Sequence, residues 1–332
     1  MSFQFTDSKD VSMKAAIYDK AGPADVLRYA DVSDPVCKVG EVLIRVEAIA
    51  VEGGDVLSRG TIDPPAPAYI GGYAAAGTII EVGSDDLGWS VGDRVATIGI
   101  GGSHADLRAV PAQACYRVPE GLDMARAVAV PVPFLTASHS LFRVARLQPG
   151  ETLLIQGAAG SVGLAAIQLA ASNEAYVIAV QAGSERVARL RELGANMVID
   201  RKVDDVVEAV RRGTDGHMAS VVLDPVGGAT LDSSIAATQA FGRILLIGNA
   251  SRVPMRPDLR PTIAENISLF GVSLRAGFAA PESKEDIEKI LEKVAKGELE
   301  VLLDKRFPLK DAAAAHKYIE DNQILGRVIL EP

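Results

Sequence analysis

The chain has 332 residues, of which 48% are hydrophobic and 23% charged, and this size and composition suit a globular protein with room for two domains. The formal net charge of −9 argues against nucleic acid or an anionic membrane as the main partner, and Cys37 and Cys115 match no disulfide framework or metal-ligand spacing. No stretch approaches the roughly 18 apolar residues of a membrane span, so we expect a cytoplasmic protein without a membrane partner.

The first part of the chain is predicted to be rich in short β-strands. Residues Met1–Ser12 are polar and carry acidic side chains, so we expect a flexible extension and no signal peptide. From Met13 to about Leu135, Gly and Pro interrupt short apolar segments, and this pattern predicts a compact, partly open β-barrel. The clearest predicted strands are Glu41–Val51, Gly77–Val82, Asp93–Ile98 and Ala109–Val110.

From about Thr136 to Leu274, strands alternate with helices. The predicted strands are Leu153–Ile155, Tyr176–Val180, Met197–Ile199, Ser220–Leu223, Ile244–Ile247 and Ser268–Leu274. The predicted helices lie near Leu164–Ala171, Arg186–Leu193, Asp204–Arg212 and Thr230–Thr238. This alternation predicts an α/β fold with a doubly wound, parallel, six-stranded sheet. After Pro281, an amphipathic helix (Lys284–Lys296) and a last strand (Gly326–Leu330) complete the chain.

A glycine-punctuated turn joins the first of these parallel strands to its helix. Its glycines, Gly157, Gly160 and Gly163, let the backbone approach phosphate oxygens, and the start of the helix favours negative charge. The spacing departs from G-x-G-x-x-G, so an ordinary strand–turn–helix is the alternative. The residues expected to hold a pyrophosphate are Gly157, Ala158, Ala159, Gly160, Ser161, Val162 and Gly163.

The end of the second parallel strand bears on the choice of dinucleotide. NAD enzymes place Asp or Glu there to accept a hydrogen bond from the ribose 2′-OH, whereas this chain has Gln181. Ser184 and Arg186 follow, and both are able to meet a 2′-phosphate. Glu185 opposes this interpretation, although an acid early in a helix also complements the helix dipole. We therefore predict NADPH as the cofactor.

Further motifs are spread over about residues 14–331. They are Ala158–Gly163 with Ile167–Ala170, Gly92–Val95, Thr136–Ala137, Leu193–Ala195, Asp224–Gly228 and Gly326–Leu330. Together they resemble the medium-chain dehydrogenase/reductase superfamily, specifically its zinc-free quinone oxidoreductase (ζ-crystallin-like) branch. The resemblance implies a GroES-like catalytic domain at 1–135, a Rossmann NADPH-binding domain at 136–274, and a segment at 275–332 that returns to the catalytic domain.

The same resemblance implies a reaction and an assembly. Hydride would pass from NADPH to a quinone or an α,β-unsaturated carbonyl (enone, enal or enoyl thioester), in the cleft between the domains. The alternative is a catalytically silent NADPH-binding protein of the ζ-crystallin type. Arg201, Gly248 and Asn249 are expected at the cofactor, and a homodimer is expected through the edge strand near Phe270.

Zinc is not expected at the catalytic centre. Zinc-containing relatives carry Cys three residues before an Asp, where this chain has Glu52 before Asp55. Their Gly-His-Glu element corresponds to Gly72–Ala74, which contains Tyr73 in place of the imidazole. Catalytic zinc needs three protein ligands, and this chain lacks them at the matching positions.

Without a metal, hydrogen-bond donors must stabilise charge on the substrate oxygen. Tyr73 is the candidate donor, with a merely packed Tyr as the alternative. Glu52 stands where relatives usually carry an Asn that contacts the nicotinamide or the substrate, so it is a candidate for the same contact. A carboxylate does not donate a hydrogen bond unless it is protonated. An ion pair between Glu52 and Arg59 is therefore an equal alternative. By the same resemblance, Thr136 is expected against the nicotinamide.

The histidines are weaker candidates. His104 follows a Gly-Gly-Ser sequence where relatives often carry an aromatic residue near the cleft, so a contact with substrate is considered for it. His217 in a Gly-Thr-Asp-Gly-His turn and His316 in a C-terminal helix are both interpreted as structural.

Overall fold

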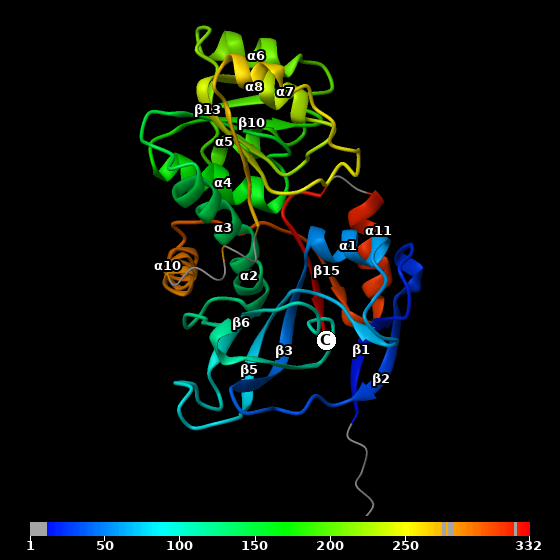
Figure 1. The fold of residues 1–332 in the computed structure, drawn as a ribbon. Helices are drawn as coiled ribbons and strands as arrows, with labels where there is room; N and C mark the ends of the chain where they lie inside the picture. The colour runs from blue at the N-terminus through cyan, green and yellow to red at the C-terminus, as the bar shows by residue number, and fades with distance from the viewer. Residues whose placement is uncertain (1–11, 274–276, 278–281, 322–323) are drawn as a thin grey trace, which may run out of the picture. The chain divides into compact units, whose positions relative to one another are not determined.

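The computed structural model describes residues 12–273, 277, 282–321 and 324–332 (Figure 1). Of the predicted extension, residues 1–11 lie outside the described residues, as does Leu274 at the end of a predicted strand, whereas Ser12 is the first residue of a strand. The chain forms two compact units. One, the β unit, comprises Met1–Val128, Lys305–Asn322 and Val328–Pro332, and the other, the α/β unit, comprises Ala129–Asp304 and Gln323–Arg327.

The β unit is built on antiparallel strands that cross long sequence distances. A seven-stranded sheet has the order β15 (Leu303–Pro308), β16 (Arg327–Glu331), β3 (Glu41–Val51), β5 (Ala74–Val82), β6 (Arg94–Ile98) and β8 (Cys115–Arg117), with β7 (Leu107–Pro111) paired to β3. A three-stranded sheet has the order β2 (Arg28–Ser33), β1 (Ser12–Tyr18) and β4 (Tyr69–Ile70). The last strand of the chain thus pairs with β3, where Val328 lies opposite Val51.

The helices of the β unit follow directly from its strands. Helix α1 (Gly53–Thr61) begins two residues after β3 ends, and α2 (Met124–Val128) follows β8. The C-terminal helix α11 (Ala312–Asp321) lies beside α1 (Figure 1). Its buried residues are Ala312, Ala315 and His316, which repeat at a helical spacing of three or four and so define one inward face.

The α/β unit confirms the predicted parallel sheet. Its strand order is β11 (Met197–Asp200), β10 (Tyr176–Gln181), β9 (Thr152–Ile155), β12 (Ala219–Asp224), β13 (Thr238–Leu246) and β14 (Ser268–Gly271), with every neighbouring pair parallel. Its helices are α3 (Pro131–Ser138), α4 (Ser161–Ser172), α5 (Val187–Glu192), α6 (Val206–Gly213), α7 (Leu231–Ala236), α8 (Arg260–Ala264) and α10 (Ser283–Ala295).

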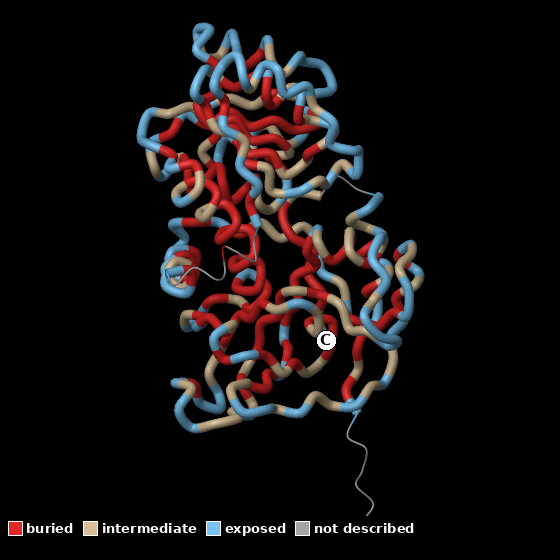
Figure 2. The backbone as a smooth tube through the Cα atoms, viewed as in Figure 1, coloured by how far each residue is buried: buried red, intermediate tan, exposed pale blue. Residues whose placement is uncertain are grey.

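Helices cover both faces of this sheet. In Figure 1, α6, α7 and α8 lie on one side, and α3 and α4 lie on the other. The inner strands carry continuous apolar sequences because both of their faces are buried. Leu154, Ile178 and Val222 are fully inaccessible and pack against α6 and α7 in one core cluster. Figure 2 shows the same distribution, with buried residues following the strands and exposed residues following the outer helices and loops.

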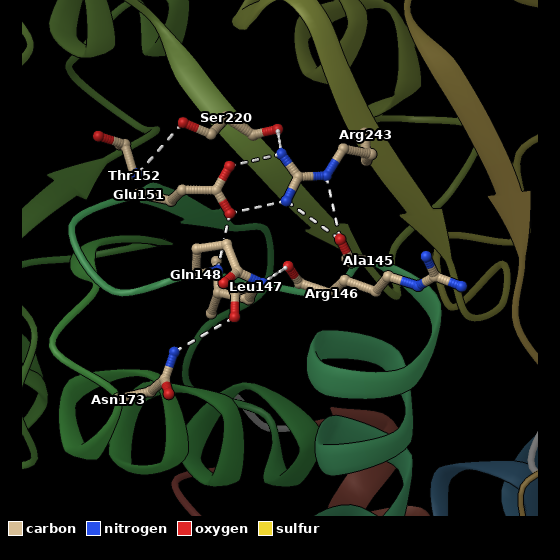
Figure 3. A network of polar contacts seen from close by, with 9 residues as sticks. All are labelled: Ala145, Arg146, Leu147, Gln148, Glu151, Thr152, Asn173, Ser220 and Arg243. Carbon is tan, nitrogen blue, oxygen red and sulfur yellow. Dashed lines mark hydrogen bonds and ion pairs between the residues drawn. The ribbon is translucent and has the colours of Figure 1, made fainter.

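A polar network ties together the amino-terminal end of this sheet (Figure 3). The Arg243 guanidinium donates from Nη1 and Nη2 to the two oxygens of Glu151, each at 2.7 Å, and from Nε to the carbonyl of Ala145 at 3.1 Å. The hydrogen bonds from Arg243 lower the pKa of Glu151 below its ordinary value of 4.5. Glu151 immediately precedes β9, so this network fixes the end of the strand opposite the glycine turn.

Candidate functional site

The glycine turn after β9 has the backbone geometry of a phosphate cradle. Gly157 has φ +60°, a conformation that side chains other than glycine rarely adopt. A Cβ at Gly163 would lie 2.6 Å from the Ala158 Cα, so glycine there lets the helix pack against the turn. Helix α4 begins at Ser161 and runs for 12 residues, and its first N–H groups have no partner within the helix.

A cavity of about 220 Å³ opens beside this turn. Six of the predicted cofactor residues line it: Gly157, Ala159, Gly160, Gln181, Arg186 and Arg201. A second cavity of about 460 Å³ shares Arg201, Thr230 and Val226 with the first and extends toward Ala250 and Ser251. The turn and the two arginines, which are distant in sequence, therefore lie around one connected space.

Other predicted cofactor residues do not line the 220 Å³ cavity. Ala158 is fully buried, whereas Ser184 is exposed. Ser161 accepts a hydrogen bond from Arg327 at 2.9 Å. Asn249, beside Gly248, bonds the Gly228 N–H at 3.2 Å and the Val253 carbonyl at 2.8 Å, so its amide connects two loops. Val162 belongs to the first turn of α4.

The end of β10 carries an unsatisfied polar atom. Gln181 is buried, its Nε2 donates to the Gly183 carbonyl, and its Oε1 has no hydrogen-bond partner among the described residues. A buried acceptor without a donor is costly unless a ligand or water supplies one. Because Gln181 lines the 220 Å³ cavity, this atom fits a ligand that brings hydroxyl groups.

Two carboxylates, those of Asp200 and Glu185, bring negative charge close to the end of β10. Asp200 ends β11 directly beside Gln181, and its Oδ1 accepts from the N–H groups of Gly183 (2.8 Å) and Lys202 (3.1 Å). These backbone hydrogen bonds, that from Gly183 most of all, lower the pKa of Asp200. The prediction that Glu185 is an early helical residue is wrong, because α5 starts at Val187. Its carboxylate folds back over Gly183.

The β unit contains a separate cavity of about 210 Å³. Its wall is formed by α1, by the loops around residues 62–73 and 100–104, and by His316 of α11. Tyr73 lines it, and its hydroxyl lies 3.4 Å from the Ser58 Oγ. A Cβ at Gly54 would lie 2.6 Å from the Tyr73 ring, so the ring packs on the first turn of α1. We name this cavity the Tyr73 pocket.

Glu52 is positioned by the helix that follows it. It is the N-cap residue of α1, where its side chain accepts from the Asp55 N–H while Asp55 Oδ2 accepts from the Glu52 N–H at 2.8 Å. Arg59 instead donates to the Gly22 carbonyl and to Glu320, at 2.5 Å each. Glu52 is buried and does not line the Tyr73 pocket.

Thr136 lies in the α/β unit, on helix α3. It is buried, and its hydroxyl donates to the Val132 carbonyl at 2.6 Å. Its predicted position against the nicotinamide stays a prediction.

Two buried histidines meet at the wall of the Tyr73 pocket. The Nε2 atoms of His104 and His316 are 3.2 Å apart, and His104 Nδ1 lies 3.2 Å from the Ser103 Oγ. Burial, and next the charge of Arg108, lower the pKa of His104 to about 4. Burial also lowers the pKa of His316, with His104 and Arg59 adding to the effect. Both rings are therefore neutral near neutral pH.

Gly72 and the buried Arg108 shape the loops around this histidine pair. Gly72 has φ +92°, and a Cβ there would lie 2.0 Å from His104 Nδ1. Arg108 donates to the carbonyls of Tyr73 (3.0 Å) and Gly101 (2.9 Å), which fixes the two loops that carry Tyr73 and His104. Burial lowers the pKa of Arg108 to about 10.

Comparisons with known proteins cover nearly the whole chain. Residues 38–120 match the family described as alcohol dehydrogenase GroES-like domain, and residues 161–296 match zinc-binding dehydrogenase. A 2-haloacrylate reductase of Burkholderia sp is 30% identical over 331 residues, covering 96% of this chain and 99% of that protein. A quinone oxidoreductase of Pseudomonas aeruginosa is also 30% identical, covering 94% and 97%. The structure of Escherichia coli quinone oxidoreductase complexed with NADPH superposes with a TM-score of 0.90 at 25% identity, covering 96% of this chain and 100% of that one.

The chain belongs to the zinc-free quinone oxidoreductase branch of the medium-chain dehydrogenase/reductase superfamily. It is an oxidoreductase. In the described part of this quinone oxidoreductase relative, no group of three or more His, Cys, Asp or Glu side chains is placed to hold a metal ion. Its described helices include none that is long and apolar enough to cross a bilayer.

Sequence reasoning about this oxidoreductase missed Asp200 and the partnership of His316 with His104. Asp200 becomes visible once the sheet order is known, because the parallel register places it opposite Gln181. The predicted C-terminal helix around His316 is present as α11, but His104 and His316 are 212 residues apart, so nothing local in the sequence linked them.

Proposed function

We propose that this chain is an NADPH-dependent reductase that transfers hydride to a quinone or an α,β-unsaturated carbonyl (enone, enal or enoyl thioester) without zinc. The observation that carries the proposal is the 220 Å³ cavity, where the glycine turn, the unpartnered Gln181 Oε1 and two arginines surround one space. The family supports a nicotinamide cofactor, and a relative's structure is described as an NADPH complex.

The chain's own groups fit a dinucleotide in this cavity. The turn and the first N–H groups of α4 would hold the pyrophosphate. Arg186 and Arg201 would meet the 2′-phosphate, since a guanidinium offers directed donors to phosphate oxygens. Asp200 does not line this cavity, and its Oδ1 accepts from two backbone N–H groups. Glu185 remains the group that favours NADH.

The substrate would occupy the Tyr73 pocket. When bound, NADPH supplies the hydride that adds to the electrophilic carbon. The task of the protein is then to orient the acceptor and to stabilise the negative charge that develops on its oxygen. Tyr69 and Tyr73 line the pocket, and burial raises the pKa of Tyr69, which keeps that phenol protonated as a donor.

We also propose a homodimer formed through β14. This strand is the last one of the parallel sheet in the described part of the chain, and Phe270 within it is 37% exposed. An unpaired strand edge that carries apolar side chains favours pairing with a second copy.

Turnover tests the proposed activity. Oxidation of NADPH and of NADH would be followed with 1,2- and 1,4-quinones, 2-alkenals, cyclic enones and enoyl-CoA esters as acceptors. We expect turnover of at least one class, faster with NADPH. The control is Gly157→Val, which strains the left-handed backbone at the turn and should abolish cofactor binding. NADPH binding without turnover of any acceptor would favour the catalytically silent alternative.

A further inference from the structure

One of the four ring nitrogens of the histidine pair in the Tyr73 pocket has no hydrogen-bond partner among the described residues. His104 uses Nδ1 toward Ser103 and Nε2 toward His316. His316 uses Nε2 toward His104, and its Nδ1 is buried with no hydrogen-bond partner in the described structure. His316 is 2% exposed and lines the pocket. A buried imidazole nitrogen left unpaired at a cavity wall is a position that a ligand's polar atom can satisfy.

The contact between the two rings determines what this nitrogen can do. A hydrogen bond between two Nε2 atoms needs one protonated nitrogen and one lone pair. If His104 donates, His316 accepts at Nε2 and its proton resides on Nδ1, which is then a donor. In that arrangement His104 Nδ1 is a lone pair, which the Ser103 hydroxyl satisfies as donor. The opposite arrangement makes His316 Nδ1 an acceptor.

We propose that the inner end of the Tyr73 pocket is an oxygen-binding subsite for an uncharged carbonyl compound, with His316 Nδ1–H as the donor and with His104 and Ser103 holding it in that tautomer. This inference rests on the proposed function, since it names the class of acceptor. His316 is thereby a substrate-binding residue, and His104 and Ser103 are positioning residues.

The charges around the pocket select against a carboxylate. Arg59 lines the pocket, but its guanidinium already pairs with Glu320 and the Gly22 carbonyl. Asp55 and Asp63 also line the pocket and would repel an anion. Neither histidine carries a charge near neutral pH. An anionic acid would lose its hydration without gaining an unpaired cation, whereas a ketone needs a single donor.

The outer part of the pocket suits an apolar body. Ile62 and Ile100 line the pocket and are 62% and 87% exposed. Pro64 and Pro65 also line it. Exposed apolar side chains at the mouth of a cavity are covered when an apolar ligand binds. The fitting compound therefore has an apolar ring or chain outside and one carbonyl oxygen inside.

A matched pair of unreactive probes tests the subsite without cofactor. The full chain would be titrated by calorimetry with cyclohexanone and with cyclohexanecarboxylate. We expect the ketone to bind and the carboxylate to bind at least tenfold more weakly. His316→Leu should weaken ketone binding by about 2- to 12-fold, the range for one neutral hydrogen bond. His316→Gln, which keeps a donor, should recover part of the loss, and the exposed His217→Leu is the control.

A second measurement uses the unmodified protein, so that a folding defect in a variant cannot decide the matter. The nitrogen chemical shifts of the imidazoles should show the proton of His316 on Nδ1 when cyclohexanone is bound. Observing it on Nε2 would overturn the proposal, as would equal binding of the two probes. Reduction of 2-cyclohexenone by His316→Leu at the unmodified rate and KM would overturn the subsite while the proposed function stands. Ketone binding with the expected tautomer but no reductase activity would leave the subsite and overturn the function.

Discussion

Acidification below pH 6.5 should destabilise the folded chain through its buried histidine pair. In the folded state the pKa of His104 is about 4, whereas in the unfolded chain it takes its ordinary value of 6.5. The unfolded state therefore binds the proton first, so the free energy of unfolding is greatest above pH 6.5 and decreases as the pH falls toward 4. A difference of two and a half pH units corresponds to about 3 kcal/mol.

Several charged or titratable groups act on this proton. Arg108 on β7 opposes it, a charge on His104 in turn opposes one on His316 of α11, and Arg59 on α1 also acts on His316. Carboxylates also lose stabilising interactions in acid, but Glu151 does so only below its ordinary pKa of 4.5. The loss of stability between pH 6.5 and about 4.5 is therefore due mainly to the histidines.

Urea denaturation across this interval measures the effect. The unmodified chain should lose stability by up to about 1.4 kcal/mol per pH unit for each proton taken up on unfolding. In His104→Phe, the free energy of unfolding should depend less on pH across this interval. The exposed His217→Phe is the control, and it should keep the part of the slope that the buried histidines cause. A flat curve for the unmodified chain, or an unchanged slope in His104→Phe, would refute the assignment of the slope to the buried pair.

The remaining predictions concern cofactor, framework, metal and assembly. Arg186→Ala should weaken NADPH binding by roughly 1–3 kcal/mol and NADH binding little, and equal losses in fluorescence titrations would contradict a phosphate contact. Arg243→Ala should lower the free energy of unfolding by about 1–3 kcal/mol because the half-buried Glu151 loses its partner, and adding Glu151→Gln should restore part of it in urea melts. Chelator treatment should leave reductase activity intact, and a measured mole of zinc per chain would overturn zinc independence. Phe270→Asp should convert a dimer to a monomer by light scattering, and a monomeric unmodified chain would exclude that assembly.

The parallel sheet was predictable because its signal is local. Each inner strand is a short apolar segment followed by turn residues, and burial of both faces enforces that composition. Residues Met197–Ile199 were expected as a strand, and the structure extends it by one residue to Asp200. The residue missed is the carboxylate beside Gln181, since strand ends depend on hydrogen bonds that composition does not encode.

The β unit was harder to predict because its elements depend on distant partners. Strand β1 pairs with β2 and β4, and the C-terminal strands β15 and β16 join a sheet whose other strands all lie before residue 118. Helix α11, expected as a C-terminal helix around His316, contains four consecutive alanines before that histidine, so its sequence alone does not indicate which face is inward. Its inward face is defined by what it packs against, so the histidine pair followed from the tertiary structure alone.

At the positions of the zinc ligands in zinc relatives, the β unit carries other polar side chains. Glu52 occupies the place of a metal-binding residue in zinc relatives, but here its carboxylate caps α1 and does not line the Tyr73 pocket. Tyr73 stands at the position of the zinc relatives' imidazole and lines that pocket, with its hydroxyl 3.4 Å from the Ser58 Oγ. Across the same pocket, His316 brings an unpaired imidazole nitrogen from α11. We propose that Tyr73 and His316 supply the neutral hydrogen-bond donors that a reductase without a metal needs to stabilise an oxyanion.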